Sequence, residues 1–395
     1  MEAGKHYFVN LTVSKKGVSN VTAAILDWGT VNSSDATPDN VYCTFTFEDR
    51  GTKWDADDAA KFNLYRAAKT ASDYITGTTE ANYDWATGYA TTPATKSYDT
   101  NHWKTTDWFW PNNLTYYHFR AAGTGASASG NPTITTDEIN GDYFEITSGT
   151  IDGGTYKDFV WGAPFKDVDN TYKFKYDGTK GFAFKADGTT EQISQALGAT
   201  NSQINMLLFH MTSQIFVTVK TTTGADKVTL KSGDDLTTVE ILRFLKDGKV
   251  LMGTGAVSTT STDRTASAYF TTGTYTAESG TTPAQVANSS FGIVPQALSW
   301  GGATAGTEAI GLRITTPDGN QYVVKDLSTC TATVSDNNLV IPYAGSSPYT
   351  INAWYPHYQY YYTVTLKQAG VANITAAVVA WETVTGDLGT ITLEN

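Results

Sequence analysis

The sequence predicts a mostly β protein of antiparallel strands, with long loops and one short helix. Short runs rich in β-branched and aromatic residues recur along the chain, and many of them alternate in character. Turn dipeptides such as Asp247-Gly248 and Asp318-Gly319 supply the positive φ that tight hairpins need. Hydrophobic residues make up 40% of the 395 residues and aromatic residues 13%, which is enough apolar surface to form folded cores.

The expected strands are short and are spread over the whole chain. After a first hairpin at residues 7–28, they lie at residues 43–49 (CTFTFED), 114–121 (LTYYHFRA), 215–221 (IFVTVKT), 238–244 (TVEILRF) and 320–327 (NQYVVKDL). In the second of these strands, alternation places about half of the side chains toward a core, and we expect Tyr117 and Phe119 among them.

One short helix is expected before residue 200. Thr189 and Gln192 have the spacing of a capping box, and Gly198 can end the helix. A second segment, residues 55–69 (DADDAAKFNLYRAAK), begins with carboxylates that favour a helix N-terminus but contains FNLY, which suits a strand. Both interpretations of that segment remain open at this point.

Two domains of similar size are expected, preceded by an additional hairpin. Residues 121–136 and 255–267 are rich in Gly, Ser and Thr, which is typical of long exposed loops. A boundary fits better near residue 200, where the predicted helix ends and the apolar run INMLLF begins. The predicted division is therefore residues 1–33, 34–200 and 201–395, in agreement with roughly 150 residues per domain.

The chain carries nearly the same segment near its two ends. Residues 7–31 align without a gap on residues 360–384, and 11 of these 25 positions are identical. Each copy is an alternating strand, a turn with Gly17 or Gly370, and a second strand, which predicts a β-hairpin. The first copy is the last hairpin of an upstream domain, a part of the first domain, or a segment exchanged between subunits.

Several ordered motifs indicate a family. The sequence resembles the fimbrillin family, the pilins and accessory subunits of type V pili on the outer surface of Gram-negative anaerobes. The resemblance depends on the order of the motifs at residues 108–123 (WFWPNNLTYYHFRAAG), 157–164 (KDFVWGAP), 207–221 (LLFHMTSQIFVTVKT), 293–298 (IVPQAL), 318–324 (DGNQYVV) and 354–366 (WYPHYQYYYTVTL). The first 33 residues depart from the family pattern, because they look like a C-terminal hairpin in another position.

This resemblance implies two transthyretin-like β-sandwich domains and a non-catalytic structural subunit of a cell-surface fimbria that mediates adhesion. It also implies assembly by strand exchange with other copies or related fimbrial subunits, and an extracellular location in a fimbrium anchored at the outer membrane. An incoming strand satisfies the free N–H and C=O groups of a sheet edge, and a head-to-tail contact of this kind builds an open filament.

Two sets of residues are the candidates for this role. The candidate strand-exchange residues alternate along the first strand of each hairpin: Tyr7, Val9, Leu11, Val13, Tyr360, Tyr362, Val364 and Leu366. In the family, a leading segment is removed after a basic residue, which makes Lys15 and Lys16 in the predicted turn the candidate processing site.

Charge and motifs exclude several other classes of function. A net charge of −12 opposes binding to nucleic acid. No apolar run is long enough to span a membrane as a helix. The five histidines lack metal-ligand spacing, and no nucleophile, P-loop or dinucleotide motif occurs. We therefore expect no enzyme activity, no catalytic or metal site and no cofactor. Cys43 and Cys330 are interpreted as unpaired core thiols in preference to one long-range disulfide.

Aromatic residues support an alternative function. Exposed aromatic faces stack on sugar rings, and Trp103 and Trp108 lie among polar residues. These two are the candidate ligand-facing aromatics for glycans or proteins of host or bacterial surfaces. The alternative is therefore a monomeric surface carbohydrate-binding protein. A glycoside-active enzyme is a weaker alternative, because carboxylate separations are set by the fold.

Overall fold

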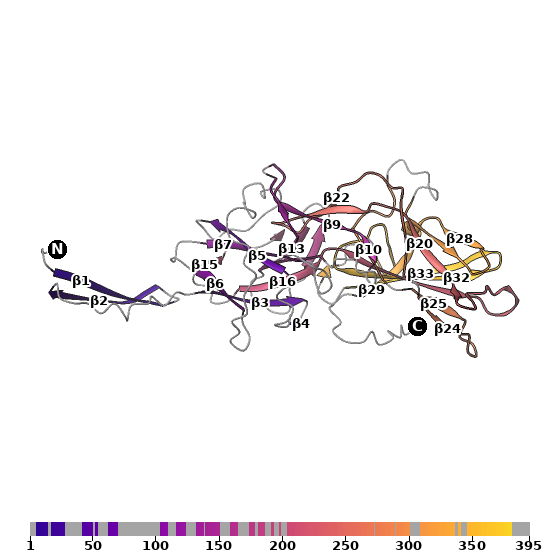
Figure 1. Cartoon of the computed structure of the whole chain (residues 1–395), viewed down its shortest axis with the longest axis horizontal. Coiled ribbons are helices and arrows are strands. Elements are labelled where there is room, and N and C mark those ends of the chain that lie inside the picture. The colour runs from indigo at the N-terminus through magenta and orange to yellow at the C-terminus, as the bar shows by residue number, and fades with distance from the viewer. Residues whose placement is uncertain are drawn as a thin grey trace.

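The structure is a computed structural model of the whole chain (Figure 1). It describes residues 5–14, 17–27, 42–49, 52–53, 62–69, 103–109, 116–123, 132–137, 139–150, 159–164, 174–177, 181–185, 191–192, 197–198, 204–271, 273–288, 290–300, 309–335, 339–340 and 346–380.

The described residues form strands and two short 3-10 helices. The strands of the first half are β1 (Lys5–Ser14), β2 (Gly17–Asp27), β3 (Tyr42–Asp49), β4 (Thr52–Lys53), β5 (Phe62–Lys69), β6 (Trp103–Phe109), β7 (Tyr116–Gly123), β8 (Ile134–Thr135), β9 (Tyr143–Thr147), β10 (Gly149–Thr150), β11 (Val160–Pro164), β12 (Phe174–Asp177), β13 (Gly181–Lys185), β14 (Glu191–Gln192), β15 (Leu197–Gly198) and β16 (Ile204–His210).

The second half continues with β17 (Ser213–Thr221), η3 (Gly224–Asp226), β18 (Lys231–Ser232), β19 (Asp235–Leu236), β20 (Thr238–Phe244), β21 (Asp247–Leu251), β22 (Val257–Thr259), β23 (Ala266–Tyr269), β24 (Thr274–Thr276), β25 (Gln285–Ala287), β26 (Phe291–Ile293), β27 (Gly311–Thr315), β28 (Gln321–Val324), η4 (Leu327–Thr329), β29 (Thr331–Ser335), β30 (Leu339–Val340), β31 (Tyr349–Thr350), β32 (Tyr358–Lys367) and β33 (Gly370–Ala380). The predicted mostly β class is therefore confirmed.

An eight-stranded sheet forms most of the first half. Its strand order is β15-β7-β11-β16-β3-β4, with β5 also paired to β7 and β6 paired to β3. Strand β7 is buried at every position after Tyr116, so both of its faces are covered. Tyr117 and Phe119 are core residues, as the sequence predicted, but the expected alternation fails because His118 and Arg120 are also fully buried.

A nine-stranded sheet and smaller sheets form the second half. The large sheet has the order β10-β26-β17-β32-β33-β29-β31, with β25 on β17 and β24 on β25. A four-stranded sheet has the order β23-β20-β27-β28. Side chains from both, including Ile215, Val364, Ile241 and Leu312, belong to one buried apolar cluster, which is the arrangement of a β-sandwich.

Four of the described strand pairs are parallel, which corrects the expectation of antiparallel pairing throughout. They are β3 with β16, β12 with β30, β17 with β32, and β29 with β33. Parallel neighbours need a long crossover connection, and for β3 with β16 and for β17 with β32 most of one half of the chain lies between the paired strands. Turn dipeptides predict hairpins between neighbouring strands but carry no information about such distant partners.

The two halves of the chain are joined by shared sheets. Strand β9 pairs with β21, β10 with β26, and β12 with β30, so three strands that precede residue 200 pair with strands that follow it. A loop after β21 adds side-chain contacts. The Trp161 indole donates to the Met252 carbonyl at 2.8 Å, and the Arg120 Nε donates to the Gly253 carbonyl at 2.8 Å. Strand pairs and side-chain hydrogen bonds therefore hold the residues before and after residue 200 together, and we call this set of contacts the interlock.

The short helix predicted from Thr189 is not seen in the described residues. Glu191–Gln192 pair with β13 and Leu197–Gly198 pair with β7 as short strands. A capping box is worth about 1 kcal/mol, and short helices are marginal alone, so pairing to existing sheets prevails. The open segment from Asp55 ends as strand β5, which pairs with β7 over its full length.

No helix within the described ranges is long and apolar enough to cross a membrane.

Candidate functional site

The two hairpins recognised in the sequence have the same backbone layout. Strands β1 and β2 correspond to β32 and β33 at both ends when 353 is added to each residue number, since 358 − 5 and 380 − 27 both equal 353. Both pairs are antiparallel, with Lys5 opposite Asp27 and Tyr358 opposite Ala380. Each also has a register shift at the aligned position, after Thr12 and after Thr365. The sequence repeat is therefore also a repeat of register and bulge.

The surroundings of the two hairpins differ. Strand β32 lies between β17 and β33, and β33 in turn pairs with β29. Among the described strands, β1 and β2 pair only with each other. Figure 1 shows this hairpin at one end of the molecule, beyond β6, β7 and β15, with β28, β32 and β33 toward the opposite end. A lone two-stranded hairpin is marginal in water, so this one is suited to joining another sheet.

The candidate strand-exchange residues of β32 are fully built into their own sheet. The exposed fractions of Tyr360, Tyr362, Val364 and Leu366 are 1%, 0%, 0% and 0%. The Trp354 indole donates to the Tyr362 hydroxyl at 3.0 Å, and burial raises the pKa of Tyr362 well above its usual value. Their counterparts Tyr7, Val9, Leu11 and Val13 lie in β1, where the side chains are outside the described part of the chain.

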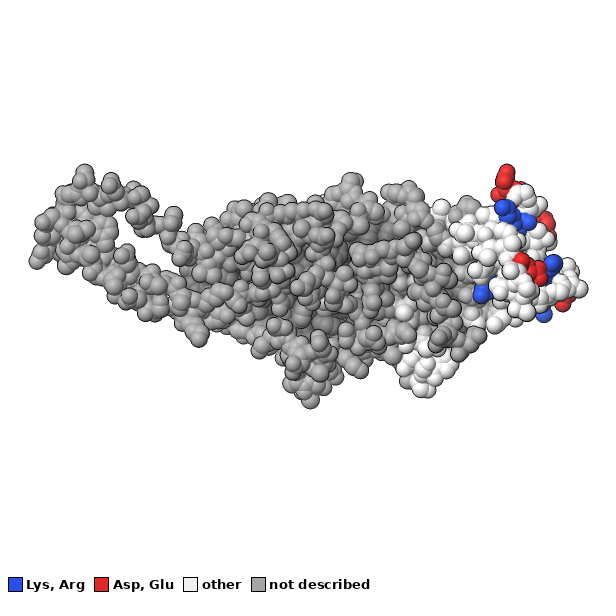
Figure 2. Space-filling view, turned by 90° about the horizontal axis from the view of Figure 1, so that it is seen from below, with Lys and Arg blue, Asp and Glu red and all other residues white. Residues whose placement is uncertain are grey.

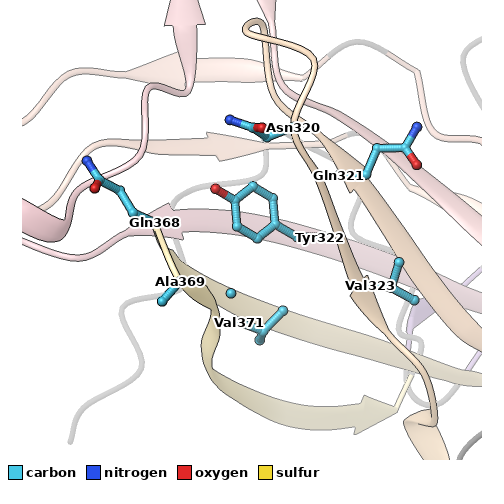
Figure 3. A pocket seen from close by; sticks show the side chains of 8 residues that line it. Asn320, Gln321, Tyr322, Val323, Gln368, Ala369 and Val371 are labelled. Atoms are coloured by element: carbon cyan, nitrogen blue, oxygen red, sulfur yellow. The ribbon is translucent and has the colours of Figure 1, made fainter.

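The end of the molecule opposite the N-terminal hairpin has an open rim. Here a groove of about 360 Å³ lies between β28 and the turn of the β32–β33 hairpin (Figure 3). We call it the rim groove; its lining residues are Asn320, Gln321, Tyr322, Val323, Gln368, Ala369, Gly370 and Val371. Among the described strands, β28 pairs on one side only, with β27. The pairing of β29 with β33 begins at Ala376, so residues 371–375 have no strand partner on that side among the described residues.

The two turns beside the rim groove, at Gly319 and Gly370, have no described atoms packed against them where a side chain would begin. A Cβ atom placed on Gly319 or Gly370 would meet no atom within 4 Å. Val323 in β28 is 43% exposed, whereas its neighbours Tyr322 and Val324 are buried. Figure 2 shows that basic and acidic side chains are interspersed over the described surface at this end. The rim thus offers strand edges and polar side chains, and not a field of one charge.

Hydrogen bonds fix the turn that leads into β28. The Asp318 carboxylate accepts from the Thr316 hydroxyl and from the Asn320 side chain, the latter at 2.7 Å. These bonds lower the pKa of Asp318, and the bond from Thr316 has the largest effect. On the other wall, the Gln368 N–H donates to the Asp226 carbonyl at 3.0 Å, which attaches the β32–β33 turn to η3. Both walls of the groove are therefore held in place.

The structure describes no side chains for the other predicted site residues. Lys15 and Lys16 fall between the end of β1 and the start of β2. Trp103 and Trp108 lie in β6, which pairs with β3, but the structure does not describe their side chains. The prediction for these residues therefore stays a prediction.

The thiol and histidine predictions can be compared with the structure. Cys330 is free and buried, so no disulfide joins it to Cys43. Burial, followed by the nearby Asp326 charge, raises the pKa of the Cys330 thiol to about 11. Folding brings His210 and His357 together, with the His210 backbone N–H donating to His357 Nδ1 at 3.0 Å. No group of three metal-ligating side chains occurs among the described residues.

Sequence reasoning missed the rim groove. Its two walls come from residues about fifty positions apart, and none of the eight lining residues is charged. The signal that could have located it is the pair of turns, Asp318-Gly319 and Ala369-Gly370, because hairpin ends in one sandwich gather at its edges.

Comparisons with solved structures give a consistent set of neighbours. A candidate cell adhesion protein of Bacteroides uniformis is 13% identical, with a TM-score of 0.46, and the match covers 88% of this chain and 99% of that one. A second, from Bacteroides ovatus, is 15% identical, with a TM-score of 0.42 and the same coverage. The chain resembles cell-adhesion and fimbrial proteins. The fimbrial anchor protein Mfa2 of Porphyromonas gingivalis is 14% identical, with a TM-score of 0.31, over 85% of this chain and 96% of that one.

These are the kinds of protein that the ordered sequence motifs led us to expect. Each TM-score is below 0.5, so the fold follows from the strand pairing alone. Comparison with models of protein families finds no match, and neither does comparison with curated proteins.

Proposed function

We propose that this protein is a non-catalytic structural subunit of a cell-surface fimbria of the type V kind, which mediates cell adhesion and assembles through exchange of β-strands. The observation that carries the proposal is the N-terminal hairpin. It repeats the register and bulge of a hairpin that is central to a nine-stranded sheet, yet it has no sheet of its own among the described strands.

The backbone explains why such a hairpin suits assembly. A strand at a sheet edge presents unpaired N–H and C=O groups, and pairing with another chain satisfies them. Among the described strands, β1 and β2 each keep one such edge, over 10 and 11 residues. The hairpin lies at one end of the chain's long axis (Figure 1). Its contact with a different surface of the next copy is head-to-tail, and such contacts build an open filament.

The remaining features of the proposal come from the same sequence motifs. The division into residues 34–200 and 201–395 as transthyretin-like sandwiches is supported by one shared feature. The eight-stranded sheet and the nine-stranded sheet each contain a parallel pair of long strands, β3 with β16 and β17 with β32. Partners are other copies or related fimbrial subunits, at the outer membrane surface. The resemblance also supports processing at Lys15-Lys16. Trp103 and Trp108 are proposed as ligand-facing aromatics because they lie among polar residues in the sequence.

Assembly of the purified chain tests the proposal. We expect linear polymers, seen by negative-stain electron microscopy and by light scattering after size-exclusion chromatography. Leu11→Pro removes a backbone donor within β1 and should abolish the polymers, whereas the matched control Leu11→Val keeps strand propensity and should polymerise. Equal thermal unfolding of the two variants shows that the body is intact. A monodisperse wild-type monomer at high concentration would contradict the proposal.

A further inference from the structure

We infer that the rim groove beside β28 is the acceptor for β1 of a second copy of this chain. This inference rests on the proposed function and names the partner surface for the donor hairpin. It commits to one contact, in which β1 pairs with the free edge of β28 and its alternate side chains enter the groove against the β32–β33 turn.

Two places in the fold have the geometry to take the hairpin: the position of β32 and the rim groove. The place that β32 occupies has the right register, but it is full. Strand β32 pairs with β17 over eight positions and with β33 over ten, and its inward side chains are completely buried. A second hairpin enters there only after these pairs are broken. The rim groove needs no such displacement, because its edges are open among the described strands.

The shape and chemistry of the rim groove suit an added strand. Strand β28 alternates between exposed and buried side chains, with Gln321 and Val323 outward and Tyr322 and Val324 inward. This is the pattern of a regular edge strand that continues its pleat to a neighbour. Three amide side chains, Asn320, Gln321 and Gln368, line the groove and can bond to polar atoms of an added strand. Main-chain pairing supplies affinity in this mode, and side-chain pockets supply specificity.

The proposed occupant of the rim groove is the N-terminal hairpin of another copy. Figure 1 places β1 and β28 at opposite ends of the chain, so the hairpin of one copy meets the groove of the next copy and not its own. Charge does not oppose this contact. Lys15 and Lys16 follow β1 in the sequence, and the rim carries both signs, with Asp318 before β28 and with Asp226 and Lys367 on the other side. Pairing of opposite charges offsets part of the repulsion between copies that each carry −12.

Cysteine cross-linking between two differently labelled chains tests the contact. One chain carries Leu11→Cys and the other Val323→Cys, and the two are mixed under mild oxidation. The matched control replaces Val323→Cys with Tyr269→Cys, since Tyr269 is 57% exposed on β23, the opposite edge of the same four-stranded sheet. The wild-type chain gives the background from its native cysteines. We expect at least tenfold more disulfide-linked heterodimer with Val323→Cys than with Tyr269→Cys.

Three substitutions on the two edge strands test the same contact without cross-linking. Val323→Lys places a charge on the free edge and should reduce polymer formation at least tenfold, whereas Val323→Thr and Tyr269→Lys should leave it unchanged. If polymers form but neither cross-linking nor Val323→Lys distinguishes β28 from β23, the acceptor is elsewhere and the proposed function stands. If neither polymers nor cross-linked heterodimers form, the inference and the proposed function both fail.

Discussion

Replacing Gly255 with Ala tests the interlock between the two halves of the chain. Gly255 has a φ of +69°, in the left-handed region, and it lies against the indole of Trp161. A Cβ atom there would lie 2.9 Å from Trp161 Cδ2 and Cε3, whereas carbon atoms in contact prefer about 3.5–4.0 Å. The substitution therefore adds backbone strain and a clash inside a buried contact.

The expected magnitude follows from these two contributions. A left-handed conformation costs an L-residue about 1–2 kcal/mol. An extra methyl group in a packed core costs about 1–3 kcal/mol. Gly280→Ala is the matched control, because Gly280 has a φ of +60° but a Cβ atom there would meet nothing within 4 Å. We therefore expect Gly255→Ala to lower the free energy of unfolding by about 1–3 kcal/mol more than Gly280→Ala does.

Urea unfolding followed by tryptophan fluorescence and by far-UV circular dichroism measures this difference. Fluorescence reports the environments of the ten tryptophans, Trp161 among them, and circular dichroism reports the strands. Equal losses of stability in the two variants would refute the packing of the loop at residues 252–256 against Trp161, and with it the interlock.

Three further predictions follow from buried or hydrogen-bonded groups. Cys330 should resist iodoacetamide at about pH 8, because its pKa of about 11 keeps the thiol protonated, and it should react after unfolding in urea; mass spectrometry of the Cys330 peptide checks this, and rapid native labelling would contradict it. Tyr362→Phe leaves the buried Trp354 N–H without its acceptor and should cost about 1–3 kcal/mol in urea unfolding, more than Tyr361→Phe, whose hydroxyl donates to Gln359 at a half-buried site. The pKa of Asp318 is lower in the folded chain, so its contribution to stability is present above the unfolded pKa of about 3.8 and is lost as the pH falls through the folded value. Wild type should therefore exceed Asp318→Asn in thermal stability at pH 7, and the difference should close at low pH; a difference that is constant with pH would argue against the carboxylate bonds.

Local signals predicted the hairpins well. The repeat at residues 7–31 and 360–384 predicted two antiparallel strand pairs, and both occur with the same bulge. Gly370 takes a φ of +139° at the expected turn. In β32, the alternating residues Tyr360 and Tyr362, named from the sequence as strand-exchange candidates, lie on the face that is buried in the chain's own core. These features depend on residues close together in the sequence, so local sequence patterns are enough to predict them.

Features that depend on distant partners could not be predicted. Nothing in the alternation of β17 indicates that β32 is its parallel neighbour, and nothing in LTYYHFRA indicates that both faces of β7 are covered. Arg120 was unexpected in the core, where its guanidinium donates to the Phe119 and Gly253 carbonyls and lies over the Trp161 ring. The predicted helix failed for a related reason, because local capping signals compete with strand partners that only the fold supplies.

Hydrogen–deuterium exchange of the β1 amides, measured on monomeric chain and on assembled chain, tests most directly whether the N-terminal hairpin joins another copy. In the monomer, the amides on the outer edge of β1 should exchange rapidly, because among the described strands only β2 pairs with it. On assembly, we predict strong protection of these amides at Tyr7–Val13 together with those of β28. Assembled chain in which the β1 amides exchange as fast as in the monomer would contradict the account.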